Sequence, residues 1–170
     1  MIKRERSIEL LNKAVAEEMT AVHQYMYFHF RLDDMGYDFL ANQFKRTAIV
    51  EMMHVEKLAE RILFLKGEVE LKTSDHVAKI HDVKGMLEKA ELMETTSIDN
   101  YNSWARECAE LADSATKAVF EELVIEEENH QDQFDTEIDN MNNFGDNYLA
   151  LQSIERSKNI ASGGKGAEKA

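Results

Sequence analysis

Apolar side chains recur along the N-terminal part of the chain at the three- and four-residue intervals of an amphipathic helix. A first run extends from about Ser7 to Asp34, and a second extends from about Asp38 to Lys66. Gly67 follows the second run in the position of a helix C-terminal cap. Because the connection between the two runs is short, they predict an antiparallel pair of helices.

A polar interval precedes a second pair of periodic runs. Residues 68–81 are polar and weakly periodic, and they are long enough to cross from one end of a helical bundle to the other. A third helix is expected over residues 82–111. A fourth is expected to start at a cap formed by Asp113 or Ser114 and to continue to about residue 143.

The C-terminal part of the chain predicts a short helix and a tail. Gly145 interrupts the pattern, residues 146–156 predict a fifth helix, and residues 161–170 read as a flexible polar tail after a domain of residues 1–160. Four long helices with one long crossover and a short fifth helix predict an all-α, ferritin-like four-helix bundle.

The composition agrees with a single helical domain. The 170 residues include no proline and seven glycines, and 44% of them are hydrophobic. The single cysteine, Cys108, cannot form an internal disulfide, which favours a reducing cytosol. The chain has no run of 18 apolar residues and no apolar stretch after its basic N-terminus, so we expect a cytoplasmic protein that is neither secreted nor membrane-spanning.

The charge balance favours cations as partners. The chain has 33 acidic and 20 basic residues, which give a formal net charge of -13. This charge would repel phosphate backbones and anionic lipids, so we expect neither nucleic acid nor membrane as the main partner. An acidic surface can equally serve solubility alone, so charge by itself does not define a function.

Two histidines each follow a glutamate by three residues, as Glu51 to His54 and as Glu127 to His130. On a helix this spacing puts both side chains on one face, where a carboxylate oxygen and an imidazole nitrogen can reach one metal ion. One such motif is weak evidence in a glutamate-rich chain, because most are solvated helix faces.

The two motifs are 76 residues apart, and further residues repeat at the same interval. Glu18 corresponds to Glu94, and Tyr25 corresponds to Tyr101. The neighbouring Glu17 corresponds to Met93, which leaves Glu18 as the candidate ligand. Each predicted hairpin therefore supplies one single glutamate and one Glu-x-x-His motif.

Two such hairpins facing each other would bring four carboxylates and two imidazoles together inside the bundle. Buried without partners, these carboxylates would repel one another and take up protons. Two divalent ions would balance the four negative charges. Mixed oxygen and nitrogen ligands suit iron, and manganese or zinc would also be accepted.

These six residues at these positions closely resemble the bacterioferritin family, and the resemblance extends from about residue 5 to 156. The stretch 60–67 and the pair Tyr148–Leu149 are also similar to the family. The resemblance implies a ferroxidase centre with two irons per subunit. Its bridging ligands would be Glu51 and Glu127, its terminal ligands the other four residues of the set, and Tyr25 would lie beside it. The predicted ligands are Glu18, Glu51, His54, Glu94, Glu127 and His130.

By the same resemblance, the expected function is iron storage and detoxification. Fe(II) would be oxidised by O2 or H2O2, and the ferric mineral would be deposited in a hollow homo-oligomeric cage. A cage of 24 subunits is favoured, with 12 as the alternative, and a ferredoxin is a candidate reductant. Some family members have an iron site on the inner cage surface at positions where this chain has Arg46 and Val50, so we do not expect that site here.

Met52 corresponds to the methionine that ligates haem between two subunits in bacterioferritins. A thioether suits haem iron, and Met52 faces away from the predicted metal centre. The alternative is that Met52 only fills a helix or dimer interface, as methionines often do. Met19, His23 and Met26 lie on a related stripe of the first helix, where they would line the same groove or pack a dimer.

Two other functional classes remain open from the sequence. A di-iron peroxidase of the rubrerythrin type has a similar bundle, but it usually adds a cysteine-rich domain, and the single cysteine argues against it. A non-enzymatic helical assembly or a haem-binding electron carrier would leave the glutamates and histidines without a role. Absence of tight Fe(II) binding would favour this last class, whereas haem binding alone would not exclude ferroxidase activity.

Overall fold

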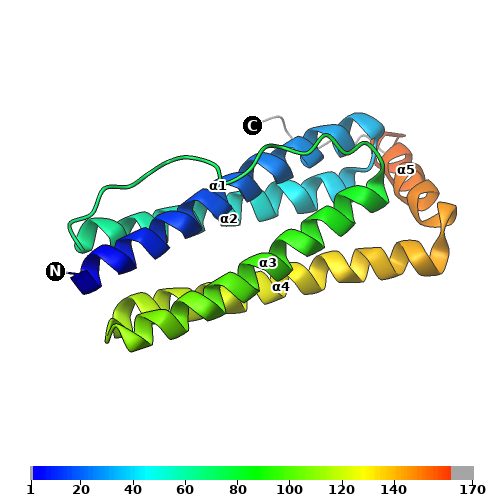
Figure 1. Cartoon of the computed structure of the whole chain (residues 1–170). Coiled ribbons are helices and arrows are strands. Elements are labelled where there is room, and N and C mark those ends of the chain that lie inside the picture. The colour runs from blue at the N-terminus through cyan, green and yellow to red at the C-terminus, as the bar shows by residue number, and fades with distance from the viewer. Residues whose placement is uncertain (1, 162–170) are drawn as a thin grey trace.

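A computed structural model describes residues 2–161 of the chain and shows five helices. Two antiparallel hairpins lie side by side, and the short fifth helix lies across one end of the bundle (Figure 1). No strand occurs within residues 2–161, which confirms the predicted all-α bundle with one long crossover. The helices are α1 (Ile2–Met35), α2 (Asp38–Phe64), α3 (Val83–Glu110), α4 (Ser114–Phe144) and α5 (Asp146–Ala161).

Aspartate side chains cap the two helices of the second hairpin. Asp82 accepts a hydrogen bond from the backbone N–H of Gly85 at 2.7 Å, at the start of α3. Asp113 accepts one from the backbone N–H of Thr116 at 3.1 Å, so Asp113 and not Ser114 caps α4. Gly145 ends α4 with a φ of 55°, in the left-handed region that glycine tolerates best.

Helix α5 is longer than the sequence pattern predicts. It continues to Ala161 because residues 157–161 contain neither glycine nor proline. Arg156, at the expected end, instead lies within α5, and its guanidinium is 3.0 Å from an Asp38 carboxylate oxygen and 2.9 Å from the Asp33 carbonyl. The remainder of the predicted tail, residues 162–170, lies outside the described residues.

The crossover between the hairpins runs along α1 as an extended strap (Figure 1). Three polar side chains of α1 hold its backbone at successive points. The Asn12 side chain donates to the Glu68 carbonyl and accepts from the Glu70 N–H, and Gln24 makes the same pair of bonds with Ala78. Between them, the Thr20 hydroxyl oxygen accepts from the Ser74 N–H. These bonds satisfy strap groups that have no helix or sheet partner.

The apolar core is divided into two clusters, one toward each end of the bundle. Leu10, Leu58 and Phe120 belong to the first cluster, and Phe28, Phe44 and Phe134 belong to the second. On every long helix, the glutamate or Glu-x-x-His motif lies between the two stretches that form these clusters. The predicted metal ligands therefore occupy a polar layer that is enclosed by apolar layers.

Candidate metal centre

Each of the four long helices contributes side chains to one buried polar layer. Glu18 comes from α1 and Glu94 from α3, and the two Glu-x-x-His motifs come from α2 and α4. The exposed fraction of the whole residue is 6% for His130 and 2% or less for the other five ligands. The structure thus brings together all six predicted ligands: Glu18, Glu51, His54, Glu94, Glu127 and His130.

The ligand atoms form two groups that share two carboxylates. The Nδ1 atom of His54 lies 2.8 Å from Glu51, 3.1 Å from Glu127 and 3.6 Å from Glu18. The Nδ1 atom of His130 lies 2.9 Å from Glu51, and 3.8 Å from both Glu94 and Glu127. Within each group one ligand atom per residue lies within 4.8 Å of every other. Glu51 and Glu127 belong to both groups, so a dinuclear site is geometrically defined.

These short contacts do not have the geometry of hydrogen bonds. Both carboxylate oxygens of Glu51, Oε1 of Glu127 and Nδ1 of both histidines are buried without a hydrogen-bond partner. Buried polar atoms are almost always paired, so five orphan atoms in one layer need an explanation. The residues that carry them belong to the two groups of mutually close ligand atoms, and two divalent cations would satisfy all of them. The residues present therefore fit a pair of metal ions.

Electrostatics show how the metal-free layer balances its charge. Burial, reinforced by the neighbouring carboxylates, raises the pKa of Glu18 and of Glu94 well above the ordinary value. Burial opposes the charged form of each histidine, but the carboxylates outweigh it, so the pKa of His54 is raised and that of His130 is raised to about 12. Burial also opposes the charged form of Glu127, yet the close approach of both histidines lowers its pKa. The layer thus takes up protons when no metal balances it.

Two tyrosines hold Glu94 and Glu18 in equivalent ways. The Tyr25 hydroxyl donates to Glu94, and the Tyr101 hydroxyl donates to Glu18. Tyr25 packs between Phe44 and Phe134, with ring centroids 5.7 and 5.6 Å away. The sequence predicted Tyr25 beside the site but gave Tyr101 no role, although the 76-residue repeat pairs the two. Each tyrosine therefore joins an apolar layer to one carboxylate.

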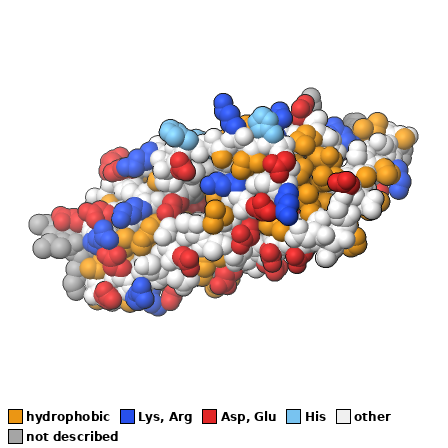
Figure 2. All heavy atoms as spheres, turned by 45° about the vertical axis from the view of Figure 1, so that its right-hand side comes forward, with side chains coloured by type: hydrophobic (Ala, Val, Ile, Leu, Met, Phe, Trp, Pro, Cys, Tyr) orange, Lys and Arg blue, Asp and Glu red, His pale blue; other side chains and the backbone are white. Residues whose placement is uncertain are grey.

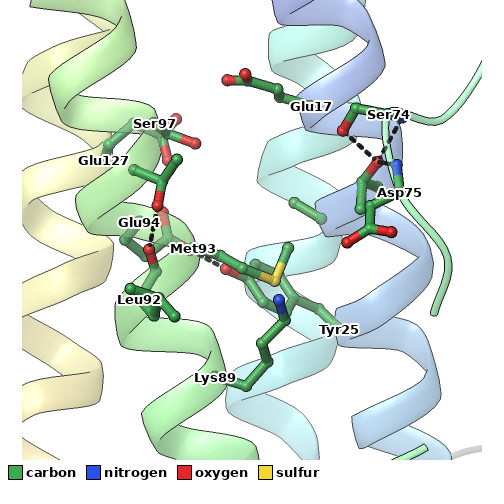
Figure 3. Close-up of a pocket in the computed structure, with 13 residues that line it drawn as sticks. Glu17, Tyr25, Ser74, Asp75, Lys89, Leu92, Met93, Glu94, Ser97 and Glu127 are labelled. Atoms are coloured by element: carbon green, nitrogen blue, oxygen red, sulfur yellow. Dashed lines mark hydrogen bonds between the residues drawn. The ribbon is translucent and has the colours of Figure 1, made fainter. Parts of the chain in front are cut away.

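A cavity of about 250 Å³ reaches the polar layer between α1 and α3. Glu94 and Glu127 form part of its wall, and Glu17, Ser74 and Asp75 line it as well. Figure 3 shows the Glu17 carboxylate facing this space from α1, opposite Glu94 and Glu127. Burial raises the pKa of Glu17 to about 7. Glu17 is therefore a wall residue of this cavity and not a member of the ligand cluster, as the sequence repeat indicated.

Met52 lies away from the cluster, on the outer surface of α2. Its side chain is 53% exposed, and the neighbouring Ile49 and Met53 are also about half exposed. These three side chains form an apolar strip at helical spacing on a single chain. On α1, His23 is exposed, whereas Met19 and Met26 pack against the core clusters. This exposed apolar strip is compatible with Met52 ligating haem and with Met52 only filling a helix or dimer interface.

The fold and the cluster together define a class of protein. Helical bundles in which two helices each supply one glutamate and two supply Glu-x-x-His motifs build dinuclear carboxylate centres. A family model described as the ferritin-like domain matches residues 8–144 of this chain.

Known relatives narrow this class. Bacterioferritin from Desulfovibrio desulfuricans is 38% identical over 148 residues, which are 87% of this chain and 83% of that protein. Bacterioferritin from Rhodobacter capsulatus is 35% identical over 145 residues, which are 85% of this chain and 89% of that protein. The chain therefore belongs to the bacterioferritin family of ferritin-like proteins.

Solved structures agree with this assignment. A crystal structure of the Desulfovibrio desulfuricans bacterioferritin, described with its diiron site in different catalytic states, matches with a TM-score of 0.87 and 37% identity. The matched region covers 89% of this chain and 88% of the Desulfovibrio desulfuricans chain. A Rhodobacter capsulatus bacterioferritin, described with a metal-free dinuclear site and haem iron, matches with a TM-score of 0.84 and 32% identity over 88% of this chain and 93% of that chain.

We predict that metal binding displaces protons from the cluster. At pH 7 the raised pKa values keep both imidazoles protonated in the metal-free protein, and each must lose its proton to become a ligand. At least two protons should therefore leave per metal pair, and metal affinity should fall as the pH is lowered. Calorimetric Zn(II) titration in two buffers of different ionisation enthalpy measures this release. Equal heats in both buffers would contradict the prediction.

Proposed function

We propose that this protein is an iron-storage ferroxidase. Fe(II) is the substrate, the buried cluster is the site of its oxidation, and the ferric product is stored as a mineral inside a hollow homo-oligomer. The observation that carries the proposal is the set of five buried ligand atoms without hydrogen-bond partners, all on residues of the two overlapping ligand groups. Its support from known proteins is a bacterioferritin relative described with a diiron site in different catalytic states.

The shared and unshared ligands suggest a role for each residue. Glu51 and Glu127 belong to both groups of ligand atoms, so they would be shared by the two ions. Glu18 and His54 complete one group, and they would hold one ion. Glu94 and His130 complete the other group and would hold the second ion.

The pair of ions, when bound, supplies two electrons together to O2 or H2O2. The protein residues contribute position, charge and exclusion of water. Four carboxylates provide hard oxygen ligands, which favour Fe(III) over Fe(II). Tyr25 and Tyr101 keep Glu94 and Glu18 in place through their hydroxyl groups. The apolar layers on both sides limit solvent access to the seams between the helices.

The cavity between α1 and α3 is the path that we assign to incoming Fe(II). Its wall contains two of the six ligands, and Glu17 and Asp75 add acidic groups farther out. Lys89 also lines the cavity, so the path is not purely acidic. A strap residue, Ser74, closes one side of this path, which gives the α1 hydrogen bonds to the strap a role in shaping it.

We further propose that Met52 ligates haem between two subunits. Its half-exposed position among other apolar side chains leaves the thioether free to meet a second copy across a two-fold axis. A bacterioferritin relative is described with its haem iron in a crystallographic special position. The soft sulfur of Met52 would suit haem iron, and the apolar strip would give the haem an apolar contact surface.

The proposed assembly is a cage of 24 subunits in the cytoplasm, with 12 subunits as the alternative. Figure 2 shows hydrophobic side chains gathered toward the end of the molecule that carries α5, while acidic side chains are spread over the same face. Phe39, Phe144, Leu151, Ile154 and Ile160 are each at least half exposed on a single chain. Apolar area of this kind marks subunit contacts in oligomers.

A ferredoxin remains the proposed reductant for iron release. Within residues 2–161, no helix combines the length and the apolar character needed to span a lipid bilayer.

Replacing a terminal ligand should abolish rapid iron oxidation. Glu18→Ala and His54→Ala should each slow it by more than about 100-fold, because even outer partners of metal ligands are worth 10- to 100-fold. The measurement is an anaerobic Fe(II) titration of the metal-free protein followed by air exposure and near-ultraviolet absorbance. The wild type should show a break at about two irons per subunit. Glu128→Ala, which removes the exposed neighbour of Glu127, is the control and should oxidise iron normally. Wild-type rates in both ligand variants would sink the proposal.

Haem binding should depend on Met52 but not on its neighbour. Met52→Leu keeps the apolar volume and removes the sulfur, so it should eliminate the absorbance of bound haem after reconstitution. Met53→Leu is the matched control, because Met53 is equally exposed on the same helix. Equal haem content in the two variants would rule out Met52 as the ligand.

The assembly should have the mass of a cage. Light scattering of the purified protein should give about 470 kDa for 24 chains of 19.6 kDa, whereas 12 chains would give about 235 kDa. A dimer or monomer at the same concentration would contradict storage in a closed cavity.

A further inference from the structure

The two histidines of the cluster have different surroundings on the side that faces away from it. The Nε2–H of His54 donates to a carboxylate oxygen of Glu126 at 2.8 Å. Glu126 in turn accepts from Lys57 at 3.2 Å, and Lys57 lies 2.9 Å from Glu122. A chain of alternating charges thus crosses the seam between α2 and α4 and ends on the outer nitrogen of His54.

The equivalent positions around His130 carry no such chain. The 76-residue repeat that relates the two motifs pairs Glu126 with Val50, Lys57 with Gln133, and Glu122 with Arg46. Val50 cannot accept a hydrogen bond, and no side chain among residues 2–161 accepts one from Nε2 of His130. The repeat therefore holds for all six ligands and both tyrosines but fails at the outer partner of the histidine.

The seam is correspondingly open on the His130 side. A cavity of about 380 Å³ lies between α2 and α4, and its lining includes His130, Val50, Arg46 and Gln133. The His130 side chain is 8% exposed, compared with 2% for His54. His54 is thus closed off by a charged side chain, whereas the His130 ring borders an open space.

An outer carboxylate changes how a histidine binds metal. It fixes which nitrogen carries the proton, holds the ring in one orientation and makes the ligating nitrogen more basic. Here the Nε2–H of His54 points to Glu126, which leaves the Nδ1 lone pair directed at the cluster. His130 receives none of these contributions from the α2 side of the seam.

We infer that Glu126 is a positioning residue that makes the two metal sites of the cluster unequal. The site completed by Glu18 and His54 binds its ion tightly, and the site completed by Glu94 and His130 binds its ion more weakly and exchanges it faster. The inference rests on the proposed function, since it requires that the cluster bind two divalent ions.

The test is a calorimetric titration of the metal-free, assembled protein with Zn(II), which is redox-inert, with Co(II) absorbance as a second readout. The wild type should bind two ions per subunit in two separate steps. Glu126→Val puts a valine beside His54, as Val50 lies at the equivalent position beside His130. It should weaken the tight step by about 10- to 100-fold and leave the other step unchanged.

Further variants separate positioning from a structural effect. Val50→Glu supplies an acceptor at the equivalent place beside His130, and it should tighten the weak step. Glu126→Gln keeps an oxygen that can accept from Nε2–H, so its loss should be smaller than that of Glu126→Val. Glu121→Val is the control, because Glu121 is an exposed carboxylate on the same helix whose ion pair is with Lys117.

The outcomes distinguish the inference from the proposed function. Failure of the wild type to bind Zn(II) or Co(II) would overturn the proposed function itself. Two equal steps in the wild type, or a loss in Glu126→Val that falls on both steps or on neither, would overturn only the inequality of the sites. If Glu126→Val does not fold, the same comparison is made with Glu126→Gln, which preserves the side-chain volume.

Discussion

The burial of four carboxylates in one layer is the constraint on which the rest of this structure depends. Charged groups are strongly disfavoured in a bundle interior unless they are neutralised, so the layer exists only with protons or cations bound. The apolar clusters on both sides hold the four helices in place and prevent the carboxylates from moving apart to reach water. A site of this kind is unfavourable for the metal-free fold, and metal binding converts that unfavourable energy into affinity.

Either protons or metal ions can neutralise the buried carboxylates of this layer. Two divalent ions carry the four positive charges that Glu18, Glu51, Glu94 and Glu127 require, while the histidines bind as neutral ligands. The metal-free layer reaches its own balance through the raised pKa values of Glu18 and Glu94 and of both histidines. Loading the site therefore exchanges protons for metal.

The sequence alone predicts the parts of the structure that depend on a regular spacing of residues. Helix positions follow from apolar spacing, the six ligands follow from the 76-residue interval, and Tyr25 follows from the family resemblance. Contacts between helices have no such period. Asn12, Thr20 and Gln24 are ordinary polar residues in the sequence, and only the fold reveals that they hold the strap. Glu126 breaks the repeat, since its counterpart is Val50, yet the structure places it against His54 because α2 and α4 meet there.

The places where the repeat fails are as informative as those where it holds. Residues inside the layer must satisfy the neutralisation requirement, so the two hairpins present the same ligands there. Residues on the seams touch solvent and carry no such requirement, so they are free to differ. In the 76-residue repeat, Glu17 on the α1–α3 seam corresponds to Met93, and Glu126 on the α2–α4 seam corresponds to Val50. Two equal sets of ligands thus lie in unequal surroundings, and the seams, not the ligands, are where the two metal positions acquire different properties.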